Sequence, residues 1–278
     1  TQLGGHLAPV TFDRPGAALK PYAVAPWCRE SLPGQPNIIK ALRGDFFCLP
    51  FGGNDTPHRG EQHPVHGETA NRKWRFVARE KTATTNTLHL RLRTKTRPGT
   101  VDKFVQLQDG HDAVYLRHVL TGFRGRMNPG HHATLRFPDH EGSGLLSCSP
   151  FVHGQVFPEP TEDPAAGGYS ILEPGAVFDD LRAVRTITGA SADLSRYPAR
   201  RGFEDIAILV ADPDLDVAWT AVSFPAEGYV WFALKDPSVL ASTLLWMSNG
   251  GRHYPPWNGR HVNVMGLEEV TAFFHLGL

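Results

Sequence analysis

The sequence has little cysteine, no excess of either charge and no long hydrophobic run. Its three cysteines, Cys28, Cys48 and Cys148, are an odd number without metal-ligand spacing. We therefore expect reduced core thiols in a cytoplasmic protein. Lys plus Arg and Asp plus Glu both total 28, which argues against a nucleic-acid partner because that binding needs a basic face. No apolar run is long enough to span a membrane, so no membrane partner is expected.

The signatures of several enzyme classes are also missing. The sequence contains no Gly-x-Ser-x-Gly nucleophile elbow and neither a phosphate loop nor a dinucleotide fingerprint. Its first residues do not form a basic segment followed by an apolar one, so no signal peptide is expected. These absences disfavour serine acyl transfer and nucleotide-dependent chemistry.

Glycine and proline are abundant and spread along the whole chain, with 28 and 23 residues. This even distribution of glycine and proline favours many short strands joined by turns. Residues 87–93 alternate Leu with polar side chains, which is typical of a half-solvated antiparallel strand. We predict one all-β domain over residues 1–278, with two large sheets packed face to face. Residues 238–247 are ambiguous between helix and strand, and residues 179–184 are compatible with one or two helical turns.

An acidic residue ends the strand predicted near the C-terminus. Residues 262–267 alternate between two faces, and Glu268 follows them directly. A carboxylate in that place is either a general base or a buried ion-pair partner. His132 begins another predicted strand and shares a face with Thr134 and Arg136, whereas His131 turns toward the core side. His132 is thus either a surface histidine or a group in a cleft.

A second candidate region is the polar loop at residues 54–73, which contains His58, His63 and His66. A loop of this length in a compact domain is often functional. Three imidazoles also allow a metal hypothesis, although their spacing matches no strong metal pattern. Trp257 precedes Glu268 in an aromatic loop, where it is either a core residue or a surface that stacks on a sugar ring.

Four segments, in order, resemble the aldose 1-epimerase (galactose mutarotase-like) superfamily. Residues 43–52 resemble its Arg-Gly-Gly-Ile-Pro…Pro-Trp/Phe-x-Gly segment, and residues 66–74 its His-Gly-Phe-Ala-Arg-x-x-x-Trp segment. Residues 132–137 are similar to its His-Pro-Tyr-Phe-Asn-Leu segment, and residues 266–269 to its Gly-Leu-Glu-Pro segment. Order and spacing agree across nearly the whole chain.

The resemblance implies a large antiparallel β-supersandwich and an acid–base site without a cofactor or metal. Glu268 would be the general base at the anomeric hydroxyl, and His132 the general acid at the ring oxygen. The remaining implied residues would bind substrate: His66, Arg43, Asp205 and, as an aromatic surface, Trp257. Such a site would hold His132 and Glu268 apart by about the width of a sugar ring, whereas direct hydrogen bonding at roughly 3 Å would leave no room for a sugar between them.

Three departures from the family pattern bear on the substrate. Ala70 replaces an arginine that would help to hold a sugar phosphate, although Arg72 is a possible substitute. Thr134 replaces an aromatic residue, and Glu269 replaces a proline. We expect an isomerase that interconverts the α and β anomers of a free aldose, as a monomer or homodimer. The alternatives are a carbohydrate-binding or sensing protein without turnover, and a different carbohydrate isomerase or lyase on the same fold.

Overall fold

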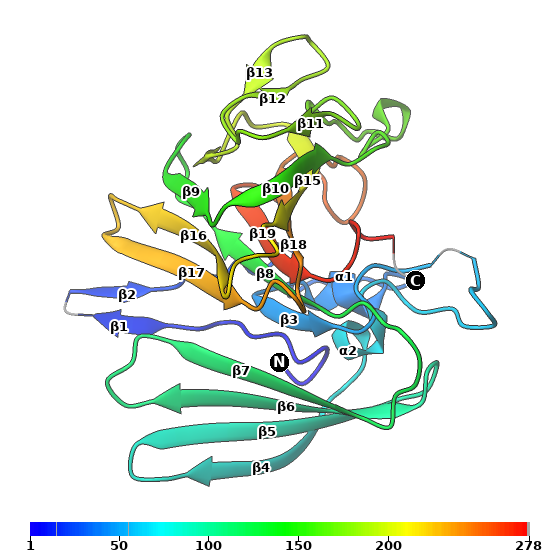
Figure 1. Cartoon of the computed structure of the whole chain (residues 1–278), viewed down its shortest axis with the longest axis vertical. Coiled ribbons are helices and arrows are strands. Elements are labelled where there is room, and N and C mark those ends of the chain that lie inside the picture. The colour runs from blue at the N-terminus through cyan, green and yellow to red at the C-terminus, as the bar shows by residue number, and fades with distance from the viewer. Residues whose placement is uncertain (15, 55, 277–278) are drawn as a thin grey trace.

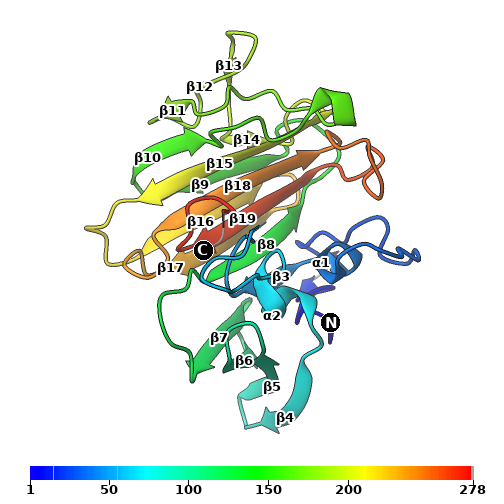
Figure 2. The same ribbon diagram turned by 90° about the vertical axis from the view of Figure 1, so that its right-hand side faces the viewer.

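The computed structural model describes residues 1–14, 16–54 and 56–276, and its centre is a seven-stranded antiparallel sheet. The strand order is β11-β10-β15-β18-β19-β8-β3. Figure 2 shows β15, β18, β19 and β8 side by side in this sheet. The strands span Val177–Phe178 (β11), Phe151–Val156 (β10), Phe203–Ala211 (β15), Ser242–Asn249 (β18), Val264–Val270 (β19), Gly130–Arg136 (β8) and Asp45–Cys48 (β3).

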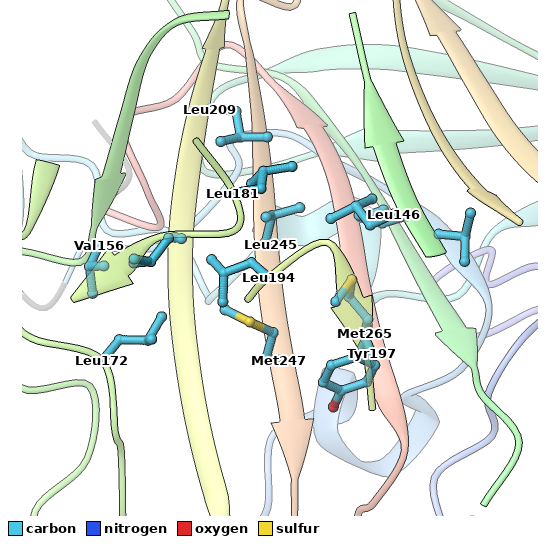
Figure 3. Packing of buried hydrophobic residues seen from close by; sticks show 14 of the residues in the cluster. Leu146, Val156, Leu172, Leu181, Leu194, Tyr197, Leu209, Leu245, Met247 and Met265 are labelled. Carbon is cyan, nitrogen blue, oxygen red and sulfur yellow. The ribbon is translucent and has the colours of Figure 1, made fainter. Parts of the chain in front are cut away.

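A four-stranded sheet packs against this central sheet, in the order β14-β9-β16-β17. Its strands are Arg196–Tyr197 (β14), Gly144–Cys148 (β9), Ala218–Phe224 (β16) and Tyr229–Lys235 (β17). Figure 3 shows the hydrophobic core between the sheets, where Leu209, Leu245 and Met265 meet Leu146 and Tyr197. Burying one such Leu or Met side chain contributes about 1.5–3 kcal/mol, so this interface holds the two sheets together.

A second four-stranded sheet, β4-β5-β6-β7, lies at the lower end of the molecule in Figure 1. It consists of Arg75–Lys81 (β4), Thr85–Thr94 (β5), Gly99–Gln108 (β6) and Val114–Thr121 (β7). Two small hairpins complete the sheets: Phe12–Arg14 with Ala17–Leu19 (β1 and β2), and Val184–Arg185 with Ser191–Ala192 (β12 and β13). The helices are short: Asn37–Ala41 (α1), Gly67–Asn71 (α2) and the 3-10 turn Pro164–Ala166.

The all-β prediction is confirmed, with antiparallel pairing throughout the central sheet. The ambiguous segment at 238–247 is mostly strand β18, and all of β18 is buried, so its apolar run reflects burial on both faces. The prediction of helical turns at residues 179–184 is wrong. This segment forms bends and a turn that lead into β12, where Asp180 accepts a hydrogen bond from the Arg182 backbone N–H.

All three cysteines are free, but only Cys48 is buried. Cys28 and Cys148 are half-buried, so the expectation of core thiols holds for one of the three. Within the described part of the chain, each helix is too short to cross a membrane.

Candidate active site

The register of β8 and β19 places Glu268 directly opposite His132. Directly paired residues of adjacent strands point to the same face of a sheet, with Cβ atoms roughly 5 Å apart. His132 Nε2 and Glu268 Oε1 are 3.1 Å apart, and both residues are almost fully buried. The expected gap of a sugar-ring width is therefore wrong, because the two groups are in direct contact and no sugar fits between them. We call the face that bears this pair the front face.

Burial favours the uncharged form of both partners in this pair. It raises the pKa of Glu268 well above its usual range. It also lowers the pKa of His132 well below its usual range, with further lowering from His66 and His6. A carboxyl group that holds its proton beside a neutral imidazole forms a pair with one transferable proton. The surface alternative for His132 is excluded by its 4% exposure.

Two neighbours fix the His132 ring. Phe46 of β3 stacks on it, with ring centroids 4.4 Å apart, and β3 is the strand next to β8 in the sheet. Thr134 Oγ1 lies 3.3 Å from His132 Nδ1. Thr134 is itself buried beside the ring, on the same strand. The ring is therefore held in place on the side away from Glu268.

His66 reaches the same place from the loop that precedes α2. Its backbone has φ 61°, a left-handed conformation that non-glycine residues adopt infrequently. The His66 ring meets the His132 ring edge to face, at 5.1 Å between centroids. Gly52 N–H lies 3.4 Å from His66 Nδ1 and donates to it weakly, which leaves Nε2 as the N–H donor. Burial lowers the pKa of His66 to about 3, so the ring is neutral.

His66, His132 and Glu268 line one cavity of about 210 Å³ on the front face. Trp257 lines it as well, at 5% exposure, so its ring is both buried and part of the cavity wall. Most of the remaining wall is apolar and comes from α1 and the residue after it, and from β15 and β18: Ile38, Ile39, Leu42, Ile206, Leu244 and Trp246. Small-molecule pockets measure roughly 300–1,000 Å³, so a ligand here is no larger than about one sugar ring.

Arg252 is a cavity residue that the sequence analysis did not select. Its guanidinium carbon lies 4.6 Å from the centre of the Trp257 ring and 5.7 Å from that of Trp246. Arg252 Nε donates to Glu162 Oε1 at 2.6 Å, and Nη1 is 3.5 Å from Glu204 Oε1. Two carboxyl groups behind the cavity wall thus compensate the arginine charge. The aromatic loop around Trp257 contained this signal, because Arg252 begins it.

Glu204 supports this wall from strand β15. It accepts hydrogen bonds from Trp246 Nε1 at 2.7 Å and from the Ser248 hydroxyl at 3.0 Å. Burial raises the pKa of Glu204 to about 7, against the lowering effect of Arg252. Glu204 therefore fixes Trp246, whose ring lies edge to face with His132 at 5.7 Å.

Two residues expected in the site do not line the cavity. Asp205 lies one position from Glu204 on β15 and faces the opposite side of the sheet. Its carboxylate accepts hydrogen bonds from the backbone N–H groups of Ile171 and Leu172, and burial raises its pKa to about 6. Arg43 donates from Nε to the Ala41 carbonyl at 3.1 Å. Both residues have partners within the protein, and neither belongs to the cavity lining.

The other histidines of the loop at residues 54–73 do not gather around a metal. His63 Nε2 is 3.0 Å from Glu61 Oε2, and Arg97 Nη2 is 2.7 Å from the same oxygen. These contacts tie the loop to the turn between β5 and β6. Within residues 1–14, 16–54 and 56–276, no three His, Cys, Asp or Glu side chains form a metal-binding group.

The fold is similar to that of solved proteins that share little sequence with this chain. A protein from Salmonella typhimurium named a "putative mutarotase" aligns with a TM-score of 0.56 and 13% identity, over 98% of this chain and 78% of its own. A galactose mutarotase-like protein from Clostridium acetobutylicum aligns with a TM-score of 0.52 and 10% identity, over 84% and 70%. An aldose epimerase homologue from C. elegans gives 0.50 and 12%, over 97% and 84%.

No family model matches the sequence, and neither does any curated protein sequence. Fold likeness at such low identity does not assign an activity. It does agree with the four ordered sequence segments, which the structure places on β3, α2, β8 and β19. The chain therefore has the galactose mutarotase-like β-sandwich fold that its aldose 1-epimerase-like segments implied.

Proposed function

We propose that this protein is an aldose 1-epimerase-like isomerase that interconverts the α and β anomers of a free aldose. The observation that carries the proposal is the buried Glu268–His132 pair, which holds one transferable proton at the edge of a cavity for about one sugar ring. Opening a hemiacetal requires removal of one proton and delivery of another. A joined acid and base supply both.

The direct contact within the pair is compatible with this chemistry if the sugar lies over the pair. The anomeric hydroxyl oxygen and the ring oxygen are bonded to the same carbon, so they are separated by a single bond angle. One edge of the sugar therefore presents both oxygens to Glu268 and His132 together. The substrate approaches from the cavity and does not separate the two side chains.

The proton transfers balance without a co-reactant. One member of the pair takes the anomeric proton while the other gives its proton to the ring oxygen, and the bond between that oxygen and the anomeric carbon breaks. Rotation about the adjacent carbon–carbon bond and the reverse transfers close the other anomer. Burial places the proton on Glu268 at the start, so Glu268 donates and His132 accepts in ring opening, and the roles exchange in ring closure. Proton transfer across the 3.1 Å contact gives the opposite starting assignment, which is the one implied by the family resemblance.

The remaining cavity groups suit an uncharged sugar. His66 offers an N–H donor to a substrate oxygen, and Trp257 offers an aromatic wall. Arg72, the possible phosphate ligand, instead bonds Glu68 Oε1 at 2.7 Å and the Arg93 carbonyl at 2.8 Å. Ala70 is fully buried. These contacts support a free aldose over a sugar phosphate.

Anomeric exchange measured by NMR on a panel of aldoses tests the proposal. We expect Glu268→Gln to lower the exchange rate by about 10²–10⁴-fold, because it removes one positioned proton carrier. The matched control is Glu141→Gln, which makes the same chemical change at an exposed site outside the cavity.

Equal exchange rates for the wild type and Glu268→Gln on every aldose would refute the catalytic role. Calorimetry on the same variants separates the alternatives. Sugar binding that survives Glu268→Gln without any rate enhancement by the wild type would identify a binding or sensing protein. Conversion of the sugar to a product other than its anomer would identify a different carbohydrate isomerase or lyase.

A further inference from the structure

A larger cavity, of about 970 Å³, lies on the opposite face of the central sheet, which we call the back face. Its floor is formed by β3, β8 and β19, and its walls by β17, β7 and the β1–β2 hairpin. Figure 1 shows β17 and β7 on either side of this hairpin. The volume is at the upper end of the range for small-molecule pockets. The back-face cavity is therefore large enough for a ligand that the front-face cavity cannot hold.

Two buried carboxylates on the floor each have an oxygen without a hydrogen-bond partner. They are Asp45 Oδ1 and Glu269 Oε1, from residues that are 8% and 5% exposed. Leaving a buried acceptor without a donor is unfavourable, and more so for a charged group. His131 lies between these residues on β8, opposite Glu269, with Nδ1 at 3.8 Å from Asp45 Oδ1. These two floor oxygens therefore lack a hydrogen-bond donor.

The charges around the back-face cavity leave a small negative balance. Asp13, Asp45, Asp112 and Glu269 line it with one cation, Arg14. Arg14 donates from Nη1 to the Glu227 and Gly228 carbonyls. Behind the wall, Lys235 pairs with Glu269 at 2.6 Å, and Lys103 interacts electrostatically with Asp45. The four carboxylates and three cations, counted at their formal charges, sum to one net negative charge.

Aromatic side chains form much of the wall around these carboxylates. Tyr22, Tyr115, Tyr229 and Trp231 line the cavity, and Tyr115 is 44% exposed at its rim. Tyr22 also interacts electrostatically with Asp45, which places this ring near the carboxylate. An aromatic face attracts a cation because the electrons of the ring concentrate negative charge on that face. Acceptor oxygens and aromatic faces thus surround the same space.

We propose that the back-face cavity is a second binding site, for an organic ammonium ion with one positive charge and an apolar or aromatic body. The ammonium N–H groups donate to Asp45 Oδ1 or Glu269 Oε1, the two carboxylate oxygens without a hydrogen-bond partner. The positive charge neutralises the site, and the body packs against Trp231 and the tyrosines. Neither Asp45 nor Glu269 belongs to the front-face cavity, so the ammonium site does not depend on the proposed isomerase activity.

Three probes with one aromatic body and different charges test the charge requirement. They are 2-phenylethylammonium, 2-phenylethanol and phenylacetate, titrated into the full chain by calorimetry at pH 7. We expect the ammonium ion to bind at least about tenfold more tightly than the alcohol, as a gain of about 1.4 kcal/mol implies. We expect no measurable binding of phenylacetate.

Variants on the two faces locate the site. Asp45→Asn removes a negative charge at nearly constant volume and should weaken ammonium binding by about tenfold. Glu268→Gln makes the same kind of change on the front face and should leave ammonium binding unaltered. If Asp45→Asn does not fold, Tyr115→Leu at the exposed rim tests the aromatic wall and should also weaken binding.

Three results would overturn the proposal. Equal affinity for the three probes would show an apolar cavity without charge selection. Ammonium binding unaffected by both Asp45→Asn and Tyr115→Leu would place the ligand elsewhere. Absence of ammonium binding at millimolar concentration would show that the cavity does not select this class.

Discussion

The front and back faces of the β8–β19 ladder carry the same two residue types in adjacent register. His132 faces Glu268 on the front, and His131 faces Glu269 on the back. The front pair is in direct contact at 3.1 Å, and among the described residues no lysine or arginine is paired with Glu268. Glu269 instead bonds Lys235 at 2.6 Å and Thr243 Oγ1 at 2.7 Å. The two faces thus differ in countercharge and not in residue type.

This difference determines what each carboxyl group can do. Without a countercharge, burial raises the pKa of Glu268, which favours the protonated form that the proposed exchange with His132 needs. A lysine beside Glu269 favours a fixed carboxylate, which suits binding a cation better than moving a proton. A buried carboxyl group therefore becomes a proton carrier or a charged ligand according to its neighbours.

The largest effect on stability is expected from removing the countercharge on the back face. Lys235→Met leaves Glu269 buried without its cation, because both side chains are almost fully buried. We expect a loss of about 3–5 kcal/mol in the free energy of unfolding, measured by urea denaturation. The double variant Lys235→Met/Glu269→Leu should recover most of this loss, since it replaces the ion pair with apolar groups.

Equal losses in the single and double variants would mean that Lys235 acts mainly through packing. The difference between the two faces would then lie in packing and not in charge. The interpretation that Lys235 keeps Glu269 as a charged carboxylate would be wrong. Glu268→Gln is the corresponding variant on the front face. Its large expected effect is on the anomeric exchange rate and not on stability.

Glu204 is an intermediate case on the front face, with a countercharge at 3.5 Å from Arg252. Its pKa rises from 4.5 to about 7 on folding. The folded state therefore binds the proton more tightly, and this contribution to stability is present below pH 4.5 and is lost as the pH rises to about 7. The loss is on the order of 3 kcal/mol for such a shift.

Thermal and urea unfolding of the wild type and Glu204→Gln between pH 4.5 and pH 8 measures this contribution. The difference in unfolding free energy between the two proteins isolates Glu204 from Glu268 and Asp205, which titrate in both. We expect the wild type to lose stability relative to Glu204→Gln as the pH rises. A difference in unfolding free energy that does not change with pH would mean that Arg252 offsets the buried charge of Glu204. The offset would then be as full as the one expected from Lys235 for Glu269.

The sequence predicted which face of a strand each residue takes better than which residues meet. The alternation of side chains along a strand correctly placed His131 and His132 on opposite faces. The four family-like segments pointed to Glu268 and His66. The direct Glu268–His132 contact depends on the register between strands that are more than 120 residues apart, which no local pattern encodes. We likewise expected Asp205 in the site, but the register of β15 with β18 places its neighbour Glu204 on the front face instead.

Arg252 and its partner Glu162 come from irregular segments, so periodicity gave no guide to them. Their role follows from packing: Trp257 and Trp246 lie under the guanidinium, and Glu162 reaches it across 90 residues of sequence. A local pattern can place a side chain on a face, but the loops that close a cavity over that face come together only in the folded chain.

The smallest effect on stability is expected at Gly266, which faces the front of β19 between Glu268 and Trp246. An added Cβ would lie 2.4 Å from Glu268 Oε1 and 3.1 Å from Trp246 Cβ. Gly266→Ala should therefore cost about 1–3 kcal/mol by overpacking and should push Glu268 away from His132. NMR exchange should show a rate loss similar to that of Glu268→Gln, and urea unfolding gives the stability change.

A double-mutant cycle with Glu268→Ala identifies the cause of this effect. Without the Glu268 carboxylate, the added methyl group meets only Trp246, so Gly266→Ala should destabilise the protein less in that background. Contacting residues typically couple by about 0.5–3 kcal/mol. Additive effects would place the strain at Trp246 alone, and the Glu268–His132 pair would then tolerate the extra methyl group. Because the new Cβ points to the front face, ammonium binding on the back face should not change in either background.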